Sequence, residues 1–262
     1  MDLSIAHSDQ RVTIGSFRDC YAFEQHVKTC RAKRGLDMVP QWYDQPVFYF
    51  SNHRSIVGDG AQVFAPHGCD ELDYELELGV VIGKAGRDIR EADAWDHVLG
   101  FTIVNDLSAR DLQRCEMKVG LGPSKGKDFA TAVGPELVPL DALRDRIDAQ
   151  GRLTLAMSCE VNGRQLSQGN AADMFFTWPQ IIAHCSRDAT LAAGDLIGSG
   201  TVGTGCILEL GPDHTGGWLK PGDCIEMEIE RLGKLTTHIV EPPSHTQQPT
   251  ASAATHRATD EG

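Results

Sequence analysis

Hydrophobic and acidic residues alternate along residues 73–82. Three carboxylates, Asp73, Glu75 and Glu77, occupy every second position at the start of this segment. The positions between and after them are apolar: Tyr74, Leu76, Leu78, Val80 and Ile82. Successive side chains of a strand point to opposite faces, so this period of two predicts a β-strand with one apolar face.

Shorter apolar segments predict the other strands, at residues 100–105, 153–161, 196–197, 207–210 and 225–230. The strand at 100–105 ends at Asp106. The strand at 153–161 leads into Asn162-Gly163, a pair typical of a tight hairpin turn. Glycines recur between residues 120 and 134, which favours an extended loop there.

Four segments predict helices, at residues 17–34, 91–97, 108–117 and 175–185. The first segment contains no Pro or Gly before Gly35. We expect Ser108 to cap the third helix, and the fourth to begin near Pro179. Strands dominate, and few helices lie between them. We therefore predict a rolled, β-rich α+β fold rather than a doubly wound parallel sheet.

The segments divide the chain into a lead-in at residues 1–16, a main domain at 17–241 and a tail at 242–262. A length of 262 residues with 41% hydrophobic content is enough for one large domain. The last segment is rich in Pro, Ser, Thr, Gln and Ala, so we expect it to be disordered.

The net charge of −13 argues against nucleic acids and anionic membranes as partners, because both attract basic surfaces. An acidic surplus also has a simpler interpretation, which is solubility. No apolar run approaches the ~18–20 residues of a membrane span, and the first residues lack the pattern of a secretory signal. We expect a cytoplasmic enzyme that acts on a small molecule.

Eight cysteines are scattered along the chain without a C-x-x-C pair. Such a distribution is typical of reduced thiols in a long chain rather than of a disulfide framework. Their spacing does not predict a zinc site.

Glu75 and Glu77 are the sharpest chemical signal. On a strand their Cα atoms are about 6–7 Å apart and their carboxylates leave the same face, where they repel each other unless solvated or neutralised. An ordinary half-exposed strand is the alternative interpretation. Asp106, at the end of a second strand, would complete an all-oxygen site suited to Mg²⁺, Mn²⁺ or Ca²⁺.

Five blocks of sequence resemble the fumarylacetoacetate hydrolase family, and the resemblance extends over residues 17–240. In chain order they are DCYAFEQH at 19–26, ELE at 75–77, NDLSARDLQ at 105–113, LGPSKGKDF at 121–129 and GDLIGSGTVG at 194–203. The first block is similar to the D-x-Y-x-x-x-Q-H segment of the fumarylacetoacetase branch. The resemblance implies a mixed β-sandwich roll of the C-terminal domain type and a homodimer.

The resemblance also implies a role for each matching residue. It gives Asp19, Glu75, Glu77 and Asp106 as ligands of a divalent cation, with Mg²⁺ expected. It gives His26 as general base, oriented by Glu209, and Lys127 as a support for the developing negative charge. The residues that would bind substrate are Tyr21, Arg110, Gln113 and Thr201.

These roles together imply a cation-dependent hydrolase that cleaves a C–C bond in a small anionic 1,3-diketo acid, in the catabolism of aromatic compounds. The alternatives on the same site are a 2-oxo acid decarboxylase acting on an oxaloacetate-like substrate, a hydratase or an isomerase. A catalytically silent metal-binding protein is a third interpretation. His26 with Glu209 favours hydrolysis, because decarboxylation requires no activated water.

Overall fold

The computed structural model of the chain describes residues 4–7 and 10–243. Its strands are β1 (Ser4–His7), β2 (Gln10–Thr13), β3 (Ser16–Cys20), β4 (Phe48–Ser51), β5 (Ile56–Val57), β6 (Ala61–Val63), β7 (Leu72–Asp73), β8 (Leu76–Ile82), β9 (Gly86–Arg87), β10 (Val98–Asn105), β11 (Ser108–Ala109), β12 (Thr131–Val133), β13 (Val138–Pro139), β14 (Ala156–Val161), β15 (Arg164–Asn170), β16 (Thr190–Leu191), β17 (Asp195–Gly198), β18 (Cys224–Ile229) and β19 (Gly233–Ile239). Its helices are α1 (Glu24–Ala32), α2 (Arg110–Val119), α3 (Trp178–Ser186), α4 (Ile207–Leu210) and α5 (Pro212–Thr215), with 3₁₀ turns η1 (Pro40–Tyr43), η2 (His53–Ser55), η3 (Glu91–His97), η4 (Leu140–Arg146) and η5 (Ala171–Asp173).

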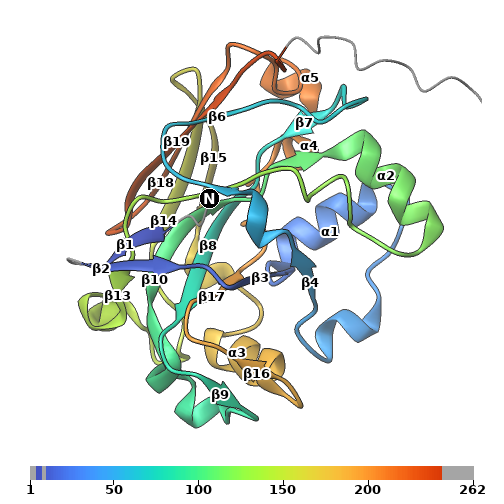
Figure 1. Ribbon diagram of the computed structural model, residues 1–262. Helices are drawn as coiled ribbons and strands as arrows, with labels where there is room; N and C mark the ends of the chain where they lie inside the picture. The colour runs from blue at the N-terminus through green and yellow to red at the C-terminus, as the bar shows by residue number, and fades with distance from the viewer. Residues whose placement is uncertain (1–3, 8–9, 244–262) are drawn as a thin grey trace, which may run out of the picture.

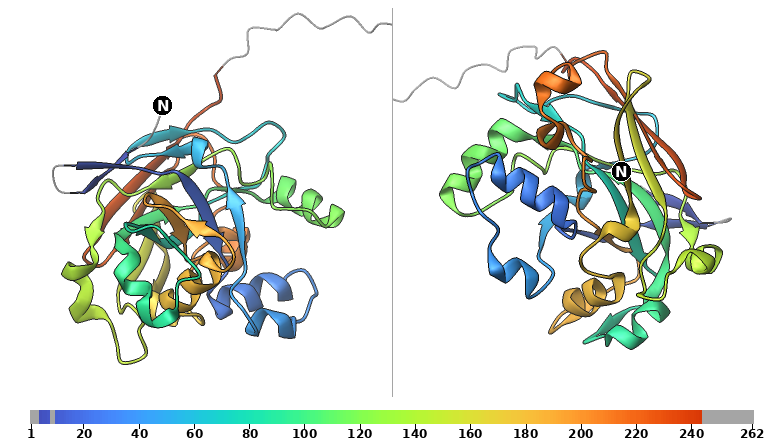
Figure 2. Two further views of the ribbon diagram at one scale, coloured as in Figure 1. Left: turned by 60° about the horizontal axis from the view of Figure 1, so that its bottom comes forward. Right: turned by 180° about the vertical axis from the view of Figure 1, so that it is seen from behind.

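Two sheets form the body of the molecule (Figure 1). The larger, of eight strands, has the order β4-β3-β17-β8-β10-β12-β5, with β13 paired to β10. The smaller, of five strands, has the order β15-β14-β18-β19-β6. Helices α1 and α2 gather on the side away from the smaller sheet (Figure 2). The predicted rolled, β-rich α+β fold is confirmed.

Strand β8 occupies the centre of the larger sheet, and every residue in it is buried. Its apolar face packs into the core between the sheets through Leu76, Leu78, Val80 and Ile82. The opposite face contributes Val81 to a second apolar cluster. The predicted strand at 73–82 is therefore present from Leu76 onward, but its acidic face is buried rather than half-exposed.

The helix predicted at 17–34 is wrong in its first third. Residues Ser16–Cys20 form β3, which pairs in parallel with β17 and antiparallel with β4, and the helix α1 starts only at Glu24. The backbone N–H of Ala22 donates to the carbonyl of Ser199 at 3.1 Å. Pairing with segments distant in sequence thus outweighs the local helical tendency, and it places Asp19 inside the sheet.

The strand predicted at 207–210 is also wrong, because these residues form the short helix α4. The carboxylate of Asp73 accepts hydrogen bonds from the N–H groups of Ile207 and Leu208, at 2.7 and 3.0 Å. Asp73 thereby satisfies two of the free N–H groups at the start of the helix. This partner is 134 residues away, so no local pattern indicates it.

Smaller differences follow from the same kind of long-range pairing. Ser108 lies in β11 and donates to the carbonyl of Asp106 instead of capping α2, which begins at Arg110. The expected loop at 120–134 contains β12. The helix near Pro179 is confirmed as α3, and the hairpin at Asn162-Gly163 joins β14 to β15.

The expected lead-in at 1–16 includes the hairpin β1–β2 and the first residue of β3. The expected tail at 242–262 lies outside the described residues from position 244 onward, so its disorder stays a prediction, as does the domain division. Within residues 4–7 and 10–243 we find no helix with the length and apolar character of a transmembrane span.

Candidate metal centre

Four carboxylates meet over the larger sheet. Asp19 lies in β3, Glu77 in β8, Glu75 just before β8, and Asp106 just after β10. One oxygen of each lies within 4.8 Å of an oxygen of every other, and all four residues are buried. The structure therefore brings together the four residues that the sequence analysis predicted as cation ligands.

Two basic side chains compensate part of this negative charge. Lys127 forms ion pairs with Glu75 and with Asp106, the latter at 2.7 Å between Nζ and Oδ2. Arg110 donates from Nη2 to Glu75 Oε1 at 2.7 Å. The hydroxyl of Tyr49 donates to Asp106. Glu75 and Asp106 are thus the well-partnered half of the cluster.

Asp19 and Glu77 form the uncompensated half. Asp19 Oδ1 and Glu77 Oε2 are buried and have no hydrogen-bond partner. Burial and the neighbouring carboxylates raise the pKa of both groups well above the usual carboxyl range. Burial alone would also raise the pKa of Glu75, but its two basic partners outweigh burial and lower it.

Two adjacent buried carboxylates, each with one oxygen that lacks a hydrogen-bond partner, require a proton or a cation for stability. Four carboxylates and no soft ligand make an all-oxygen donor set, which suits a hard divalent cation such as Mg²⁺, Mn²⁺ or Ca²⁺. The residues present therefore fit such an ion.

Gly198 makes the convergence of Asp19 and Glu77 possible. It lies in β17, between the two strands that carry them, and pairs with Asp19 on one side. A Cβ at this position would lie 2.9 Å from Glu77 Oε2 and closer still to Asp19 Oδ1. Any side chain here would push the two carboxylates apart.

We expect Gly198→Ala to weaken Mg²⁺ binding by about 10–100-fold, the size typical of changes that displace metal ligands indirectly. Gly79→Ala is the matched control, because a Cβ at Gly79 would meet Val104 and Leu196 rather than carboxylates. Both variants should melt at lower temperature, but only Gly198→Ala should lose affinity in titration calorimetry. Equal affinities in the two variants would contradict this role of Gly198.

A histidine–glutamate pair lies beside the carboxylates. His26 of α1 donates from Nδ1 to Glu209 Oε2 of α4 at 2.9 Å, and both side chains are buried. The ring of Tyr21 meets the imidazole edge-on, with 5.6 Å between ring centres. The predicted pairing of His26 with Glu209 is therefore present, although α4 is helical rather than extended.

The environment of His26 favours its charged form. Burial lowers its pKa, but hydrogen bonds to Cys206 and Glu209 and the charge of Glu75 outweigh burial and raise the pKa to about 10. The influence of Glu75 matters, because it links the protonation of His26 to the charge of the carboxylate cluster.

Arg110 and Asp73 connect the two parts of the site. Arg110 donates to Glu75 from Nη2 and to Asp73 from Nε, the second at 2.8 Å. Asp73 in turn holds the N-terminus of α4, the helix that carries Glu209. One buried network thus positions both a cation ligand and the partner of His26.

The remaining predicted residues also border the site. Gln113 accepts a hydrogen bond from Arg110 Nη1 at 3.1 Å, and Thr201 donates to Glu77 Oε1 at 3.4 Å. Together with Tyr21 against His26, the candidate substrate-binding residues thus surround the carboxylates and the histidine–glutamate pair.

A known protein family matches most of this chain. Residues 16–240 match the family described as fumarylacetoacetate (FAA) hydrolase C-terminal. The chain belongs to the fumarylacetoacetate hydrolase family.

Among relatives within this family, the oxaloacetate tautomerase YisK of Bacillus subtilis is 36% identical over 200 residues, which cover 75% of this chain and 62% of that protein. The human mitochondrial oxaloacetate tautomerase FAHD2A is 36% identical over 198 residues, covering 75% of this chain and 59% of the relative. This chain therefore spans about three fifths of the length of these curated relatives.

The fold is shared with a fumarylpyruvate hydrolase from Pseudomonas aeruginosa, whose crystal structure contains Mn²⁺ and pyruvate. That structure gives a TM-score of 0.75 at 24% identity and covers 92% of this chain and 96% of its own. The family expectation is confirmed. These relatives do not single out the fumarylacetoacetase branch, to which the D-x-Y-x-x-x-Q-H segment pointed.

Sequence reasoning missed two residues that shape the centre in this family member, Asp73 and Gly198. Asp73 was visible only as one acidic position of the alternating strand. Gly198 stood inside a family block without a role. Their functions depend on contacts across strands, and only the glycine-rich composition of residues 194–203 offered a local signal.

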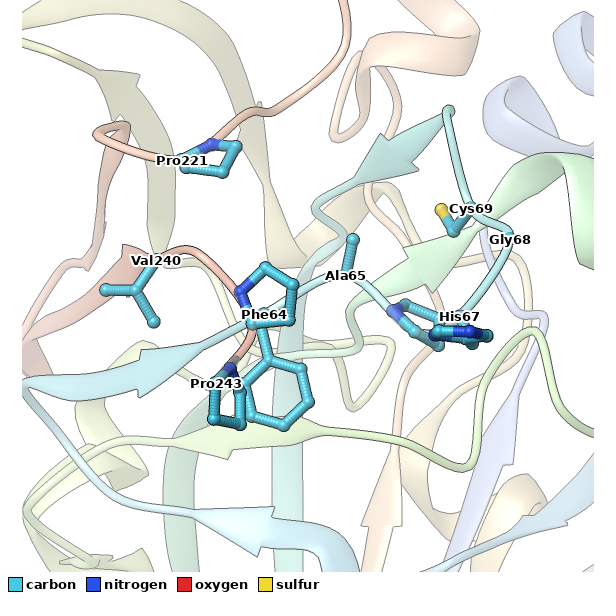
Figure 3. A pocket seen from close by; sticks show the side chains of 10 residues that line it. Phe64, Ala65, His67, Gly68, Cys69, Pro221, Val240 and Pro243 are labelled. Atoms are coloured by element: carbon cyan, nitrogen blue, oxygen red, sulfur yellow. The ribbon is translucent and has the colours of Figure 1, made fainter. Parts of the chain in front are cut away.

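A cleft of about 260 Å³ opens beside the carboxylates. It is lined by Tyr49, Phe50, Ser51, Asn52, Pro123, Ser124, Lys127 and Asp128. A larger hollow, of about 530 Å³, lies between residues 64–69 and the segment around Pro242 and is mainly apolar (Figure 3). None of the predicted site residues lines that hollow, so the smaller cleft is the better candidate for substrate access.

Proposed function

We propose that this chain is a cation-dependent hydrolase that cleaves a C–C bond in a small 1,3-diketo acid of the acylpyruvate class. The observation that supports this proposal is the buried His26–Glu209 pair next to four converging carboxylates. Hydrolysis needs both a site for positive charge and a base that activates water.

The pair is arranged for a base. Glu209 holds the Nδ1–H of His26, so in the neutral ring Nε2 is the proton acceptor. The raised pKa favours the charged imidazole while Glu75 is ionised. Because the charge of Glu75 contributes to that raised value, a cation that offsets this charge should lower the pKa of His26.

Positive charge at the carboxylates has a second role in the proposed reaction. Asp19, Glu75, Glu77 and Asp106 would hold a divalent cation, which would supply positive charge to stabilise an enolate-like oxygen as the C–C bond breaks. Lys127 and Arg110, both buried beside Glu75, add fixed positive charge that favours an anionic substrate. We propose Mg²⁺ as the ion, and a homodimer as the assembled form.

A second candidate function is tautomerisation of oxaloacetate, because the curated relatives of about 36% identity are oxaloacetate tautomerases. Moving a proton between carbon and oxygen needs the same charge stabilisation and a proton-transfer group, but no attack by water. The two functions therefore differ in whether the base acts on water or on substrate.

Parallel assays test the proposal. Acetylpyruvate and longer acylpyruvates would be incubated with the enzyme and Mg²⁺, with a chelator as control, and pyruvate release would be measured. Oxaloacetate enol-to-keto conversion would be followed by ultraviolet absorbance. We expect Mg²⁺-dependent pyruvate release. Fast tautomerisation without acylpyruvate cleavage would overturn the hydrolase proposal in favour of the second candidate.

A further inference from the structure

Three soft metal-binding side chains meet beneath helix α1. His26 and Cys30 lie one turn apart on α1, and Cys206 immediately precedes α4. Cys30 Sγ lies 3.7 Å from His26 Nε2 and 3.8 Å from Nδ1, and Cys206 Sγ lies 4.0 Å from Nδ1. One donor atom of each residue lies within 4.8 Å of the others, and all three residues are buried.

These separations match the edges of a tetrahedral zinc site. With Zn–S near 2.3 Å and Zn–N near 2.0–2.1 Å, ligand atoms at tetrahedral angles are about 3.5–3.8 Å apart. The observed distances from Nδ1 of His26, 3.8 Å to Cys30 Sγ and 4.0 Å to Cys206 Sγ, exceed this only slightly. Two cysteines and one histidine are also a known three-ligand zinc set, with a fourth position left open.

Charge and chemistry select the kind of ion. Both cysteines are free thiols, and two thiolates would balance the charge of one divalent ion inside the protein. Sulfur and imidazole ligands prefer Zn²⁺ and similar thiophilic ions, whereas the carboxylates prefer Mg²⁺, Mn²⁺ or Ca²⁺. The two clusters therefore differ in the ions that they select.

We propose that His26, Cys30 and Cys206 form a second metal site, specific for a thiophilic divalent ion of the Zn²⁺ class. The ion would take Nδ1 of His26 and replace the hydrogen bond from this nitrogen to Glu209. If His26 is the base, as proposed above, an ion at this site removes the base and inhibits the enzyme. The binding of the ion does not itself depend on whether His26 is the base. The residue spacing gave no sign of such a site, because Cys206 is 180 positions from His26.

Cadmium is the probe, because thiolate ligation to Cd²⁺ produces a charge-transfer band in the ultraviolet. The reduced full chain would be titrated with Cd²⁺ in excess Mg²⁺, which occupies the carboxylates, and then competed with Zn²⁺. We expect a band that saturates at one equivalent and disappears as Zn²⁺ displaces Cd²⁺. Changes outside the ligand shell already weaken binding about 10–100-fold, so Cys30→Ser and Cys206→Ser should each weaken it at least about 100-fold.

Cys159→Ser is the matched control, because Cys159 is equally buried but belongs to neither metal cluster. It should bind Cd²⁺ as the unaltered protein does. Circular dichroism identifies any variant that fails to fold. If one of Cys30→Ser and Cys206→Ser does not fold, Cd²⁺ binding by the other tests the site. Absence of the band in the folded unaltered protein, or equal binding in a folded Cys30→Ser or Cys206→Ser variant, would overturn the site.

Activity gives a separate result. Micromolar Zn²⁺ should inhibit the Mg²⁺-supported reaction, and Cys30→Ser should relieve the inhibition. A saturable Cd²⁺ band without Zn²⁺ inhibition would leave the metal site standing and contradict His26 as the base. Absence of hydrolysis with a normal band would contradict only the proposed function.

Discussion

His26→Ala is expected to lower kcat for acylpyruvate hydrolysis by about 10²–10⁴-fold, the usual contribution of a general base. Binding of Mg²⁺ should persist, because the four carboxylates remain. Glu209→Gln should cause a smaller loss, since the imidazole stays but its orientation and charge stabilisation weaken. His214→Ala, which alters an exposed histidine, is the matched control and should leave kcat unchanged.

The pH dependence of the same variants sharpens this test. A base must be deprotonated, so the rate should fall as the pH drops below the pKa of His26. That pKa is raised to about 10 by Cys206, Glu209 and Glu75, against the effect of burial. Mg²⁺ bound at the carboxylates offsets the charge of Glu75. The acidic limb of the pH–rate profile should therefore move to lower pH as the Mg²⁺ concentration rises. An acidic limb that survives unchanged in His26→Ala would refute the base assignment.

Glu77→Gln should make the metal-free protein more stable while abolishing its response to Mg²⁺. An amide nitrogen at this position can donate to the unpartnered Asp19 Oδ1, so a hydrogen bond replaces a repulsion. A hydrogen-bond partner for such a buried, unsatisfied group stabilises the folded state by on the order of 1–3 kcal/mol. By contrast, the free energy of unfolding of the unaltered protein should rise by about 2.7 kcal/mol at an Mg²⁺ concentration of 100 times Kd.

Thermal melts with chelator and with Mg²⁺ would measure both effects, and Glu136→Gln, at an exposed position, is the control. If Glu77→Gln were less stable than the unaltered protein without metal, Glu77 would not be an uncompensated charge. If Mg²⁺ still raised its melting temperature fully, Glu77 would not be a ligand.

The pH dependence of metal-free stability follows from the same groups. Burial and neighbouring carboxylates raise the folded-state pKa values of Asp19 and Glu77. At a pH between the usual carboxyl range and these raised values, the folded chain therefore holds more protons than the unfolded chain. The contribution of these groups to stability is therefore present at low pH and lost as the pH rises through that window. Mg²⁺ should suppress this loss.

Local patterns in the sequence were sufficient for some parts of this molecule. The alternation around Glu75 and Glu77 indicated a strand with two carboxylates on one side, and the structure places both in one cluster. The density of short strands indicated the fold class. In each case the signal is contained in a few neighbouring residues, where periodicity acts directly.

Other parts depended on partners far away in the chain. Residues 17–20 look helical in isolation but pair with β17 and β4. Residues 207–210 look extended, yet Asp73 caps them as a helix. The need for glycine at position 198 becomes apparent only when Asp19 and Glu77 are both in place. Such contacts have no local signature, so only the resemblance to a family pointed to residues such as His26 and Glu209.

The two halves of the site rest on parts of the fold with different resistance to local opening. Glu77 is on β8, a wholly buried strand with a partner on each side, so exposing it requires nearly complete unfolding. His26 is on α1, a nine-residue helix with only three buried residues. By the same criterion we expect that helix to open at a smaller free energy, which would give ions and solvent a route to the imidazole while the carboxylates keep their geometry.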